Sequence, residues 1–290
     1  MAALELVATT PTLFVVWCVL LGLVVGSFLN VVIYRLPLMM EREWRMQCAE
    51  WLGQPDASGD SPALSLWGPR SHCPHCGHLI LAVENIPLLS YLWQRGRCAH
   101  CGAAIGIQYP VVEASSGLLA GIVAWHFGFG WPAAAALLFT WILLAASVID
   151  LHRQLLPDDL TLPLLWLGLV AALFGLFTDL SSAVIGAMAG YLSLWTVYQV
   201  FRLLTGKEGM GYGDFKLLAA LGAWAGWQHL IAIVLLSSLV GALVGLALIL
   251  LRGRDRQTPM PFGPFLAAAG WIVLLWGEPI NRAYLHGLGW

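Results

Sequence analysis

The chain has 290 residues, of which 59% are hydrophobic and only 10% are charged, and its mean hydropathy is +0.79. Soluble domains carry about 25% charged residues, so this composition indicates a membrane protein whose main surroundings are the lipid bilayer. The net charge is −2 and no basic stripe is present to hold phosphates, which excludes nucleic acid as an expected partner.

Eight apolar segments have roughly the 20 residues that a helix needs to cross a bilayer. The expected fold class is therefore all-α, a polytopic membrane bundle of about eight transmembrane helices. The first segment is not expected to be a cleavable signal peptide, because no basic region precedes it. The sixth is short for a span. The segments cover residues 12–34, 111–128, 132–150, 160–178, 182–204, 214–228, 229–251 and 262–281.

The placement of basic residues predicts the orientation of these spans. With eight spans the connections alternate sides, and only Arg282 of the 14 lysines and arginines falls on the second side. Cytoplasmic connections are enriched in Lys and Arg, so the first side is predicted to be the cytoplasm. Both termini are then expected to face outward.

Residues 35–110 are the long polar stretch of the chain, and they are predicted to form a cytoplasmic domain between a first span (1–34) and the remaining helices (111–290). Within this stretch, residues 39–52 are typical of an amphipathic helix lying on the membrane or of a surface helix packed on the domain. Residues 53–69 predict a flexible loop.

Four cysteines in two CxxC pairs, separated by 21 residues, predict a structural zinc site. Each pair presents two thiolates, and Gly77 and Gly102 follow where tight turns need them. A pair of disulfides is the alternative, which the reducing cytoplasm disfavours. The expected ligands are Cys73, Cys76, Cys98 and Cys101.

Histidines crowd the same segment, so a mixed histidine and cysteine shell is a second alternative. The four-thiolate shell is favoured over it, because the paired spacing already fills the coordination sphere. Cys18 and Cys48 lack a partner at ligand spacing and are expected to be packing residues. The neighbouring histidines are His72, His75, His78 and His100.

Asp150 and Asp214 stand at the ends of long apolar segments, where an ionisable group is costly without a function. Two carboxyl groups held close together do not both ionise readily, so one keeps its proton while the other acts as a base. The base deprotonates a water molecule that attacks an amide, and the acid protonates the developing oxyanion or the leaving amine. The pair therefore predicts an aspartic protease.

The structural alternative is that the acidic residues cap helices. Capping alone would explain Asp214 at a helix start, but the helix dipole opposes a carboxylate at a C-terminus, where Asp150 lies. Capping is the favoured interpretation for Asp158 or Asp159. His152 and Lys216 either bias the charge of the pair or extend along the membrane interface.

Glycines four residues apart recur in the apolar segments and permit close helix approach in lipid. We expect them to support a compact bundle. No long-period repeat is visible, which argues against a transporter built from duplicated halves. The pairs are Gly22/Gly26, Gly117/Gly121, Gly186/Gly190, Gly222/Gly226 and Gly241/Gly245.

Several motifs together resemble one family. Gly211-Tyr-Gly-Asp214 is similar to the GxGD signature of membrane aspartyl proteases, and the longer Gly209–Lys216 resembles that of the type IV prepilin peptidases, in particular the PilD type of Gram-negative bacteria. The four cysteines match that family's zinc ligands. The remaining matches, in the family's order, are Gly26–Pro37, Glu84-Asn-Ile-Pro87, Tyr109-Pro-Val-Val-Glu113 and Ile149–Asp158.

The resemblance implies an enzyme of the bacterial inner membrane with two activities. It would cleave the basic leader from type IV prepilins and type II secretion pseudopilins, with Asp150 and Asp214 as its catalytic residues. It would then methylate the new N-terminal residue with S-adenosylmethionine as the methyl donor. No glycine-rich methyltransferase loop is visible, so the candidates for shaping the donor site come from the motifs around Asn30, Arg35, Gly96 and Glu113.

Three other functions compete with this interpretation. A transporter with a proton relay predicts carboxylates in the middle of spans, and an intramembrane metalloprotease predicts a motif such as HExxH, which this sequence lacks. A membrane-anchored zinc module that binds a partner would leave the aspartates with structural roles.

Overall fold

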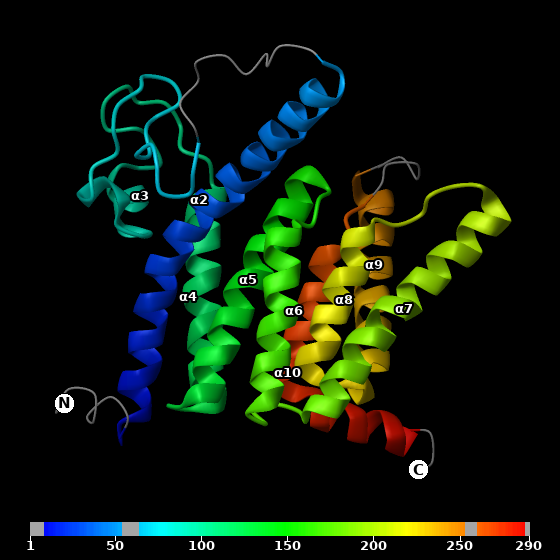
Figure 1. The fold of residues 1–290 in the computed structure, drawn as a ribbon. Helices are drawn as coiled ribbons and strands as arrows, with labels where there is room; N and C mark the ends of the chain where they lie inside the picture. The colour runs from blue at the N-terminus through cyan, green and yellow to red at the C-terminus, as the bar shows by residue number, and fades with distance from the viewer. Residues whose placement is uncertain (1–8, 54–63, 253–259, 288–290) are drawn as a thin grey trace. The chain divides into compact units, whose positions relative to one another are not determined.

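A computed structural model describes residues 9–53, 64–252 and 260–287 of the chain. The described residues form helices and turns, with isolated β-bridges in place of strands, which confirms the all-α fold class for them. The chain divides into two compact units, Met1–Phe129 and Gly130–Trp290, and each is described by itself (Figure 1).

The first unit is built on two antiparallel helices, α2 (Pro11–Trp51) and α4 (Gln108–Phe127). Their backbones approach closely at Gly22 and Gly26, because a side chain there would meet Ser116 or the backbone of Glu113. Ser116 strengthens the contact by donating its hydroxyl to the carbonyl of Gly22 at 2.5 Å. The small residues therefore act as expected in this pair.

Helix α2 extends beyond the predicted span 12–34 by more than four turns. Its buried residues end at Pro37, and most side chains beyond it are exposed. Leucine, methionine, glutamate and arginine, all strong helix formers, follow the proline and carry the helix on to Trp51. The predicted helix over 39–52 is thus the continuation of α2, while the predicted loop 53–69 lies largely outside the described residues.

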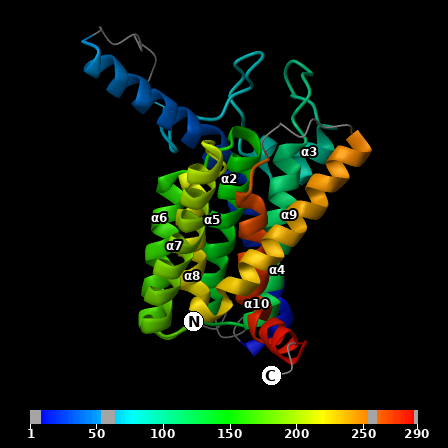
Figure 2. The same cartoon turned by 90° about the vertical axis from the view of Figure 1, so that its right-hand side faces the viewer.

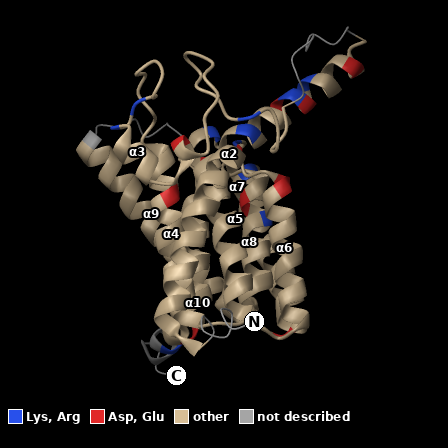
Figure 3. Ribbon diagram, turned by 90° about the vertical axis from the view of Figure 1, so that its left-hand side faces the viewer, with Lys and Arg blue, Asp and Glu red and all other residues tan. Residues whose placement is uncertain are grey.

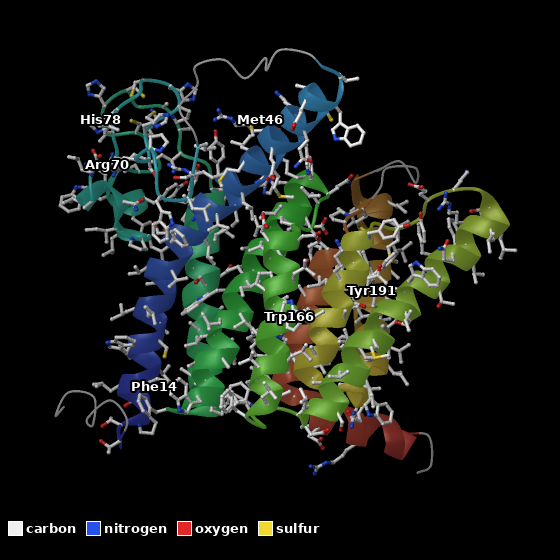
Figure 4. The ribbon with its side chains drawn as sticks, in the orientation of Figure 1. Phe14, Met46, Arg70, His78, Trp166 and Tyr191 are labelled. Atoms are coloured by element: carbon white, nitrogen blue, oxygen red, sulfur yellow. The ribbon has the colours of Figure 1, made fainter. Side chains whose placement is uncertain are left out.

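Between α2 and α4 the chain forms a small module with little regular structure. It contains the 3-10 turn η1 (Val83–Asn85) and the short helix α3 (Leu89–Trp93). His78 and Arg70, labelled in Figure 4, lie in its loops. Two isolated β-bridges, His72 with Leu79 and Arg97 with Ala104, close two similar hairpins.

The second unit contains six helices and a 3-10 turn, η2 (Trp227–His229), among its described residues. Helix α8 lies at its centre, because nine of its residues from Phe215 to Trp224 and its Asp214 are buried against α6, α7 and α10. Helix α9 leans away from the others toward its C-terminal end (Figure 2). The helices are α5 (Trp131–Arg153), α6 (Asp158–Leu173), α7 (Leu180–Thr205), α8 (Tyr212–Ala225), α9 (Leu230–Arg252) and α10 (Gly263–Gly287).

Within the described residues, five helical segments are long and apolar enough to cross a membrane: Pro11–Trp51, Trp131–Arg153, Leu180–Thr205, Trp227–Leu251 and Gly263–Arg282. The charged residues lie mainly near the helix ends, and the middle of the helices carries few of them (Figure 3). Three of the eight predicted spans correspond to α4, α6 and α8. Helices α6 and α8, with 16 and 14 residues, are shorter than a typical span, and α4 carries polar residues in its first turns.

Gly222→Ala is expected to destabilise the second unit by about 1–3 kcal/mol. A methyl group at Gly222 would collide with the carbonyl of Gly186, so α7 and α8 would have to separate. Thermal unfolding in detergent measures the effect. Gly241→Ala is the matched control, because its methyl would meet only Phe265 at 3.4 Å. Equal melting temperatures for the two variants would contradict this packing.

Candidate active site

Asp150 lies in the last turn of α5 and is only 5% exposed. Helix α5 ends at Gln154, whose left-handed backbone lets its N–H bond to the carbonyl of Asp150 at 2.9 Å. The side chain points to another helix: its Oδ2 accepts a hydrogen bond of 3.0 Å from the N–H of Gly263, the first residue of α10.

Asp214 occupies the first turn of α8 and is 8% exposed. Gly211 is the N-cap of this helix, and no side chain caps it. The carboxyl group of Asp214 interacts with the backbone of Gly211, which is compatible with the capping alternative. Its Oδ1 is fully buried and has no hydrogen-bond partner among the described residues.

The two carboxyl groups interact with one another electrostatically. Leu156, in the loop after α5, packs beside both helix starts. A side chain added at Gly213 would meet its Cβ at 2.7 Å, and one added at Gly263 would meet its methyl groups at 3.1 Å. The end of α5 and the beginnings of α8 and α10 therefore converge, and they bring two acidic groups of distant sequence together.

Asp158 does not cap α6, contrary to the prediction, because the N-cap is Pro157 and no side chain caps the helix. It binds Lys216 instead, with Nζ 2.6 and 2.7 Å from its two carboxylate oxygens. This ion pair joins the first turns of α6 and α8 beside Asp214. Asp159 and His152 are exposed.

The four predicted ligand cysteines form one cluster in the first unit, with all sulfurs within 4.8 Å of one another. Each knuckle is closed by an equivalent backbone hydrogen bond: Gly77 N–H donates to Cys73 O at 2.9 Å, and Gly102 N–H donates to Cys98 O at 2.9 Å. Both glycines have positive φ, of 71° and 73°. Such a cluster of sulfurs is able to bind a metal ion.

Backbone N–H groups favour the thiolate form of two of the four cysteines. The N–H groups of Cys76 and His75 lower the pKa of the Cys73 thiol to about 7, and those of Cys101 and His100 lower the pKa of Cys98. All six cysteines are free, and the described metal-binding group contains no histidine. His78 pairs with Glu84 at 3.1 Å instead.

The four candidates for the methyl-donor site all lie in the first unit but not at one place. Asn30 of α2 donates its amide to the carbonyl of Tyr109 at 3.1 Å, and its buried Oδ1 has no partner among the described residues. Glu113 of α4 accepts the N–H of Leu88 at 2.9 Å. Gly96 lies in the module, where it packs against Tyr91.

Arg35 lines a cavity in the first unit. The cavity has a volume of about 260 Å³, and Arg70, Trp67 and Asn85 are also among its lining residues. Arg35 is 7% exposed and donates to the carbonyls of Ser65 at 2.8 Å and Pro69 at 2.6 Å, so it fixes the loop that forms one wall. Trp67 stacks on Phe28 with ring centroids 5.7 Å apart.

The sequence interpretation missed Gly263 and Leu156, which both touch the aspartate site. A signal for Gly263 was present in the segment Met260-Pro-Phe-Gly-Pro264, because a proline in the first turn is typical of a helix start. That signal predicts where α10 begins but not which side chain its first N–H contacts. Leu156 lies inside the motif Ile149–Asp158, but nothing about a leucine there indicates that it packs beside the aspartates.

Two family models match this chain. The model of the bacterial peptidase A24 N-terminal domain matches residues 20–127, and that of the type IV leader peptidase family matches residues 137–246. The second match contains both aspartates. No solved structure matches the chain.

Relatives match along nearly the whole chain. A prepilin leader peptidase/N-methyltransferase of Pseudomonas aeruginosa is 58% identical over 290 residues, which is 100% of this chain and 99% of the relative. Proteins of the same name from Stutzerimonas stutzeri and Aeromonas hydrophila are 57% and 58% identical, over 99% and 97% of this chain and 99% and 97% of their own lengths. The chain therefore belongs to the type IV leader peptidase family, the peptidase A24 family.

Proposed function

We propose that this chain cleaves the leader from type IV prepilins and type II secretion pseudopilins and then methylates the exposed N-terminus. The observation that carries the first activity is the convergence of two buried, interacting carboxyl groups, Asp150 and Asp214, at one end of the second unit. The relatives' names support both activities.

In the proposed cleavage, one carboxylate takes a proton from water as the water oxygen attacks the scissile carbonyl, and the other carboxyl group donates its proton. Two acidic groups sharing one proton are the arrangement of aspartic proteases. The helix ends that hold them suit a substrate whose basic leader lies in water and whose next segment is an apolar helix. The scissile bond of such a substrate lies at the membrane boundary.

We also propose that α4, α6 and α8 cross the membrane with the five longer segments, giving eight spans. Helix α8 rises only about 21 Å at 1.5 Å per residue. Because α8 is packed among α6, α7 and α10, most of its residues contact protein and not lipid. It therefore does not need the length of a helix that crosses the bilayer alone. The asymmetry of lysine and arginine supports our proposal that the aspartates and the cysteines lie at the cytoplasmic side of the inner membrane. Functionally, we assign residues 1–34 to a first span, 35–110 to a zinc domain and 111–290 to the peptidase helices.

Zinc is the metal proposed for Cys73, Cys76, Cys98 and Cys101. Four thiolates suit tetrahedral Zn²⁺ and leave no open position for water, so the role is structural. The module is stabilised mainly by this cluster, because the one buried side chain among its residues 64–107 is that of Cys73.

We propose that the methyl donor, S-adenosylmethionine, binds in the cavity beside Arg35. In this proposal Asn30, Glu113 and Gly96 do not contact the donor but hold the neighbouring backbone in place. The side chains that line the cavity fit S-adenosylmethionine. The indole of Trp67 offers a stacking face for its adenine, and the exposed guanidinium of Arg70 suits its carboxylate. When bound, the donor would supply the methyl group. The protein's residues would hold it and keep the loop of Arg35 in place.

Arg35→Ala is expected to weaken binding of the methyl donor at least about tenfold while leader cleavage persists, because the cavity wall loses both bonds that fix it. Equilibrium dialysis of labelled S-adenosylmethionine measures binding, and transfer of label to mature pilin measures activity. Arg45→Ala, at an exposed position of α2, is the control. Unchanged donor binding in the Arg35 variant would place the donor elsewhere.

One assay separates the proposed function from its rivals. Purified protein in detergent, mixed with a prepilin, should release the leader peptide. A transporter, the second function that the sequence left open, would release none. A partner-binding zinc module would hold the prepilin without cutting it. Neither rival accounts for two buried carboxyl groups at helix ends.

A further inference from the structure

We propose that the first N–H of α10, from Gly263, holds Asp150 as the ionised base of the cleavage reaction and that Asp214 carries the shared proton. This proposal rests on the proposed peptidase activity and adds to it a positioning residue and a role for each aspartate. The 3.0 Å bond from Gly263 N to Asp150 Oδ2 is the observation on which it is built.

The place of Asp150 explains why it needs such a partner. It lies in the last turn of α5, where the carbonyl groups at the helix C-terminus oppose a negative charge. The N-terminus of α10 has the opposite polarity, and its first N–H points at the carboxylate. A donor to a buried carboxylate oxygen stabilises the charged form. The N-terminus of α10 thus offsets the unfavourable electrostatic effect of the C-terminus of α5 on a charged Asp150.

Asp214 lacks a corresponding donor on one of its oxygens. Its Oδ1 is fully buried with no partner in the described part of the chain, and a charged oxygen buried without a donor is costly. The helix dipole and the backbone of Gly211 favour a charge on Asp214, but neither places a donor on that oxygen. A proton on Asp214 removes this cost, and it also removes the repulsion from Asp150.

Charged groups on the surrounding elements do not reverse this assignment. Asp214 is the titratable group that α8 brings against Asp150. Asp158 at the start of α6 is neutralised by Lys216. The described charged side chains of α10, Glu278 and Arg282, lie at its other end. His152 on α5 is exposed.

The assignment gives a balanced sequence of steps. Asp150 takes a proton from water as the water oxygen bonds to the carbonyl carbon, and the carbonyl oxygen takes the proton of Asp214. The C–N bond then breaks, and the leaving nitrogen takes the proton from Asp150. One hydroxyl of the intermediate returns a proton to Asp214 as the new acid forms, so both aspartates regain their starting states.

Gly263 is required here for its small size as well as its N–H. A Cβ at this position would lie 2.6 Å from Asp150 Oδ2 and 3.1 Å from a methyl group of Leu156. Alanine would therefore push the carboxylate away from the donor. In Gly263→Ala, we expect kcat for leader cleavage to fall at least about tenfold with little change in KM. The acidic limb of the pH profile of kcat/KM should move to higher pH, because the carboxylate form of Asp150 loses its donor.

Two further variants distinguish this role from simple packing. Gly241→Ala, the same chemical change at a roomy position, should keep the wild-type kcat and pH profile. In the double variant Gly263→Ala/Leu156→Ala, the contact with Leu156 is relieved but the one with Asp150 remains, so cleavage should stay low. The double variant also serves as the test if Gly263→Ala alone does not fold, as judged by thermal unfolding.

The outcomes are separable. A folded Gly263→Ala enzyme with wild-type kcat and pH profile would overturn the inference, as would recovery of kcat in the double variant. Wild-type protein that fails to cleave prepilin would instead overturn the proposed function itself. Loss of kcat with a shifted acidic limb supports the inference.

Discussion

Asp150→Asn and Asp214→Asn should each reduce leader cleavage by about a hundredfold to ten-thousandfold, the usual contribution of a general acid or base. Asparagine keeps the shape of the side chain but can neither accept the proton of water as a carboxylate does nor donate an acidic one. The rate of leader release from a purified prepilin, followed by mass spectrometry, is the measurement.

The double variant should be hardly slower than either single variant. The two carboxyl groups act on the same water and the same proton, and residues that act as a unit have strongly non-additive effects. If the losses multiply instead, the two aspartates serve separate steps, and the shared-proton mechanism is wrong.

Asp159→Asn is the matched control for both variants. Asp159 is exposed in the first turn of α6, close in sequence to the site but outside it. We expect it to cleave at the wild-type rate and to unfold at the wild-type temperature. Wild-type activity in Asp150→Asn or Asp214→Asn would refute the proposed pair.

The features that the sequence predicted correctly are those with short-range causes. The knuckles at Cys73–Cys76 and Cys98–Cys101 each depend on a few neighbouring residues and a glycine of positive φ, so their spacing already implies the local structure. Most of the glycine pairs lie at helix contacts for a similar reason: a surface of small residues permits close approach wherever the partner comes from.

The features that the sequence did not predict depend on contacts between residues far apart in the chain. Gly263 meets Asp150 across 113 positions of sequence, and Lys216 meets Asp158 across 58. Nothing local to either residue identifies its partner. The capping prediction for Asp158 failed because a strong ionic partner from α8 was available, and a local rule does not include such a partner. Helix α2 is longer than its predicted span because hydropathy indicates where the membrane ends and not where a helix ends.

Serine at both Cys73 and Cys101 should remove the metal from the protein and unfold the module that surrounds it. Purified wild-type chain is expected to hold about one zinc ion, and the double variant almost none. Structural zinc sites supply most of the folding free energy of such small modules, on the order of 10 kcal/mol. The hairpins here contain one buried side chain, Cys73 itself, so no hydrophobic core would replace the metal.

Metal analysis by mass spectrometry and limited trypsin digestion measure the two effects. Arg70, Arg95 and Arg97 lie in the module, so its unfolding should open trypsin sites there, and a chelator should have the same effect on the wild type. Cys48→Ser, at an exposed position of α2 outside the cluster, should retain both its zinc and its resistance to trypsin. Full zinc content in the double variant would mean that the sulfur cluster is not the metal site. Zinc loss without new cleavage would mean instead that the hairpins fold without their metal, which their lack of a core argues against.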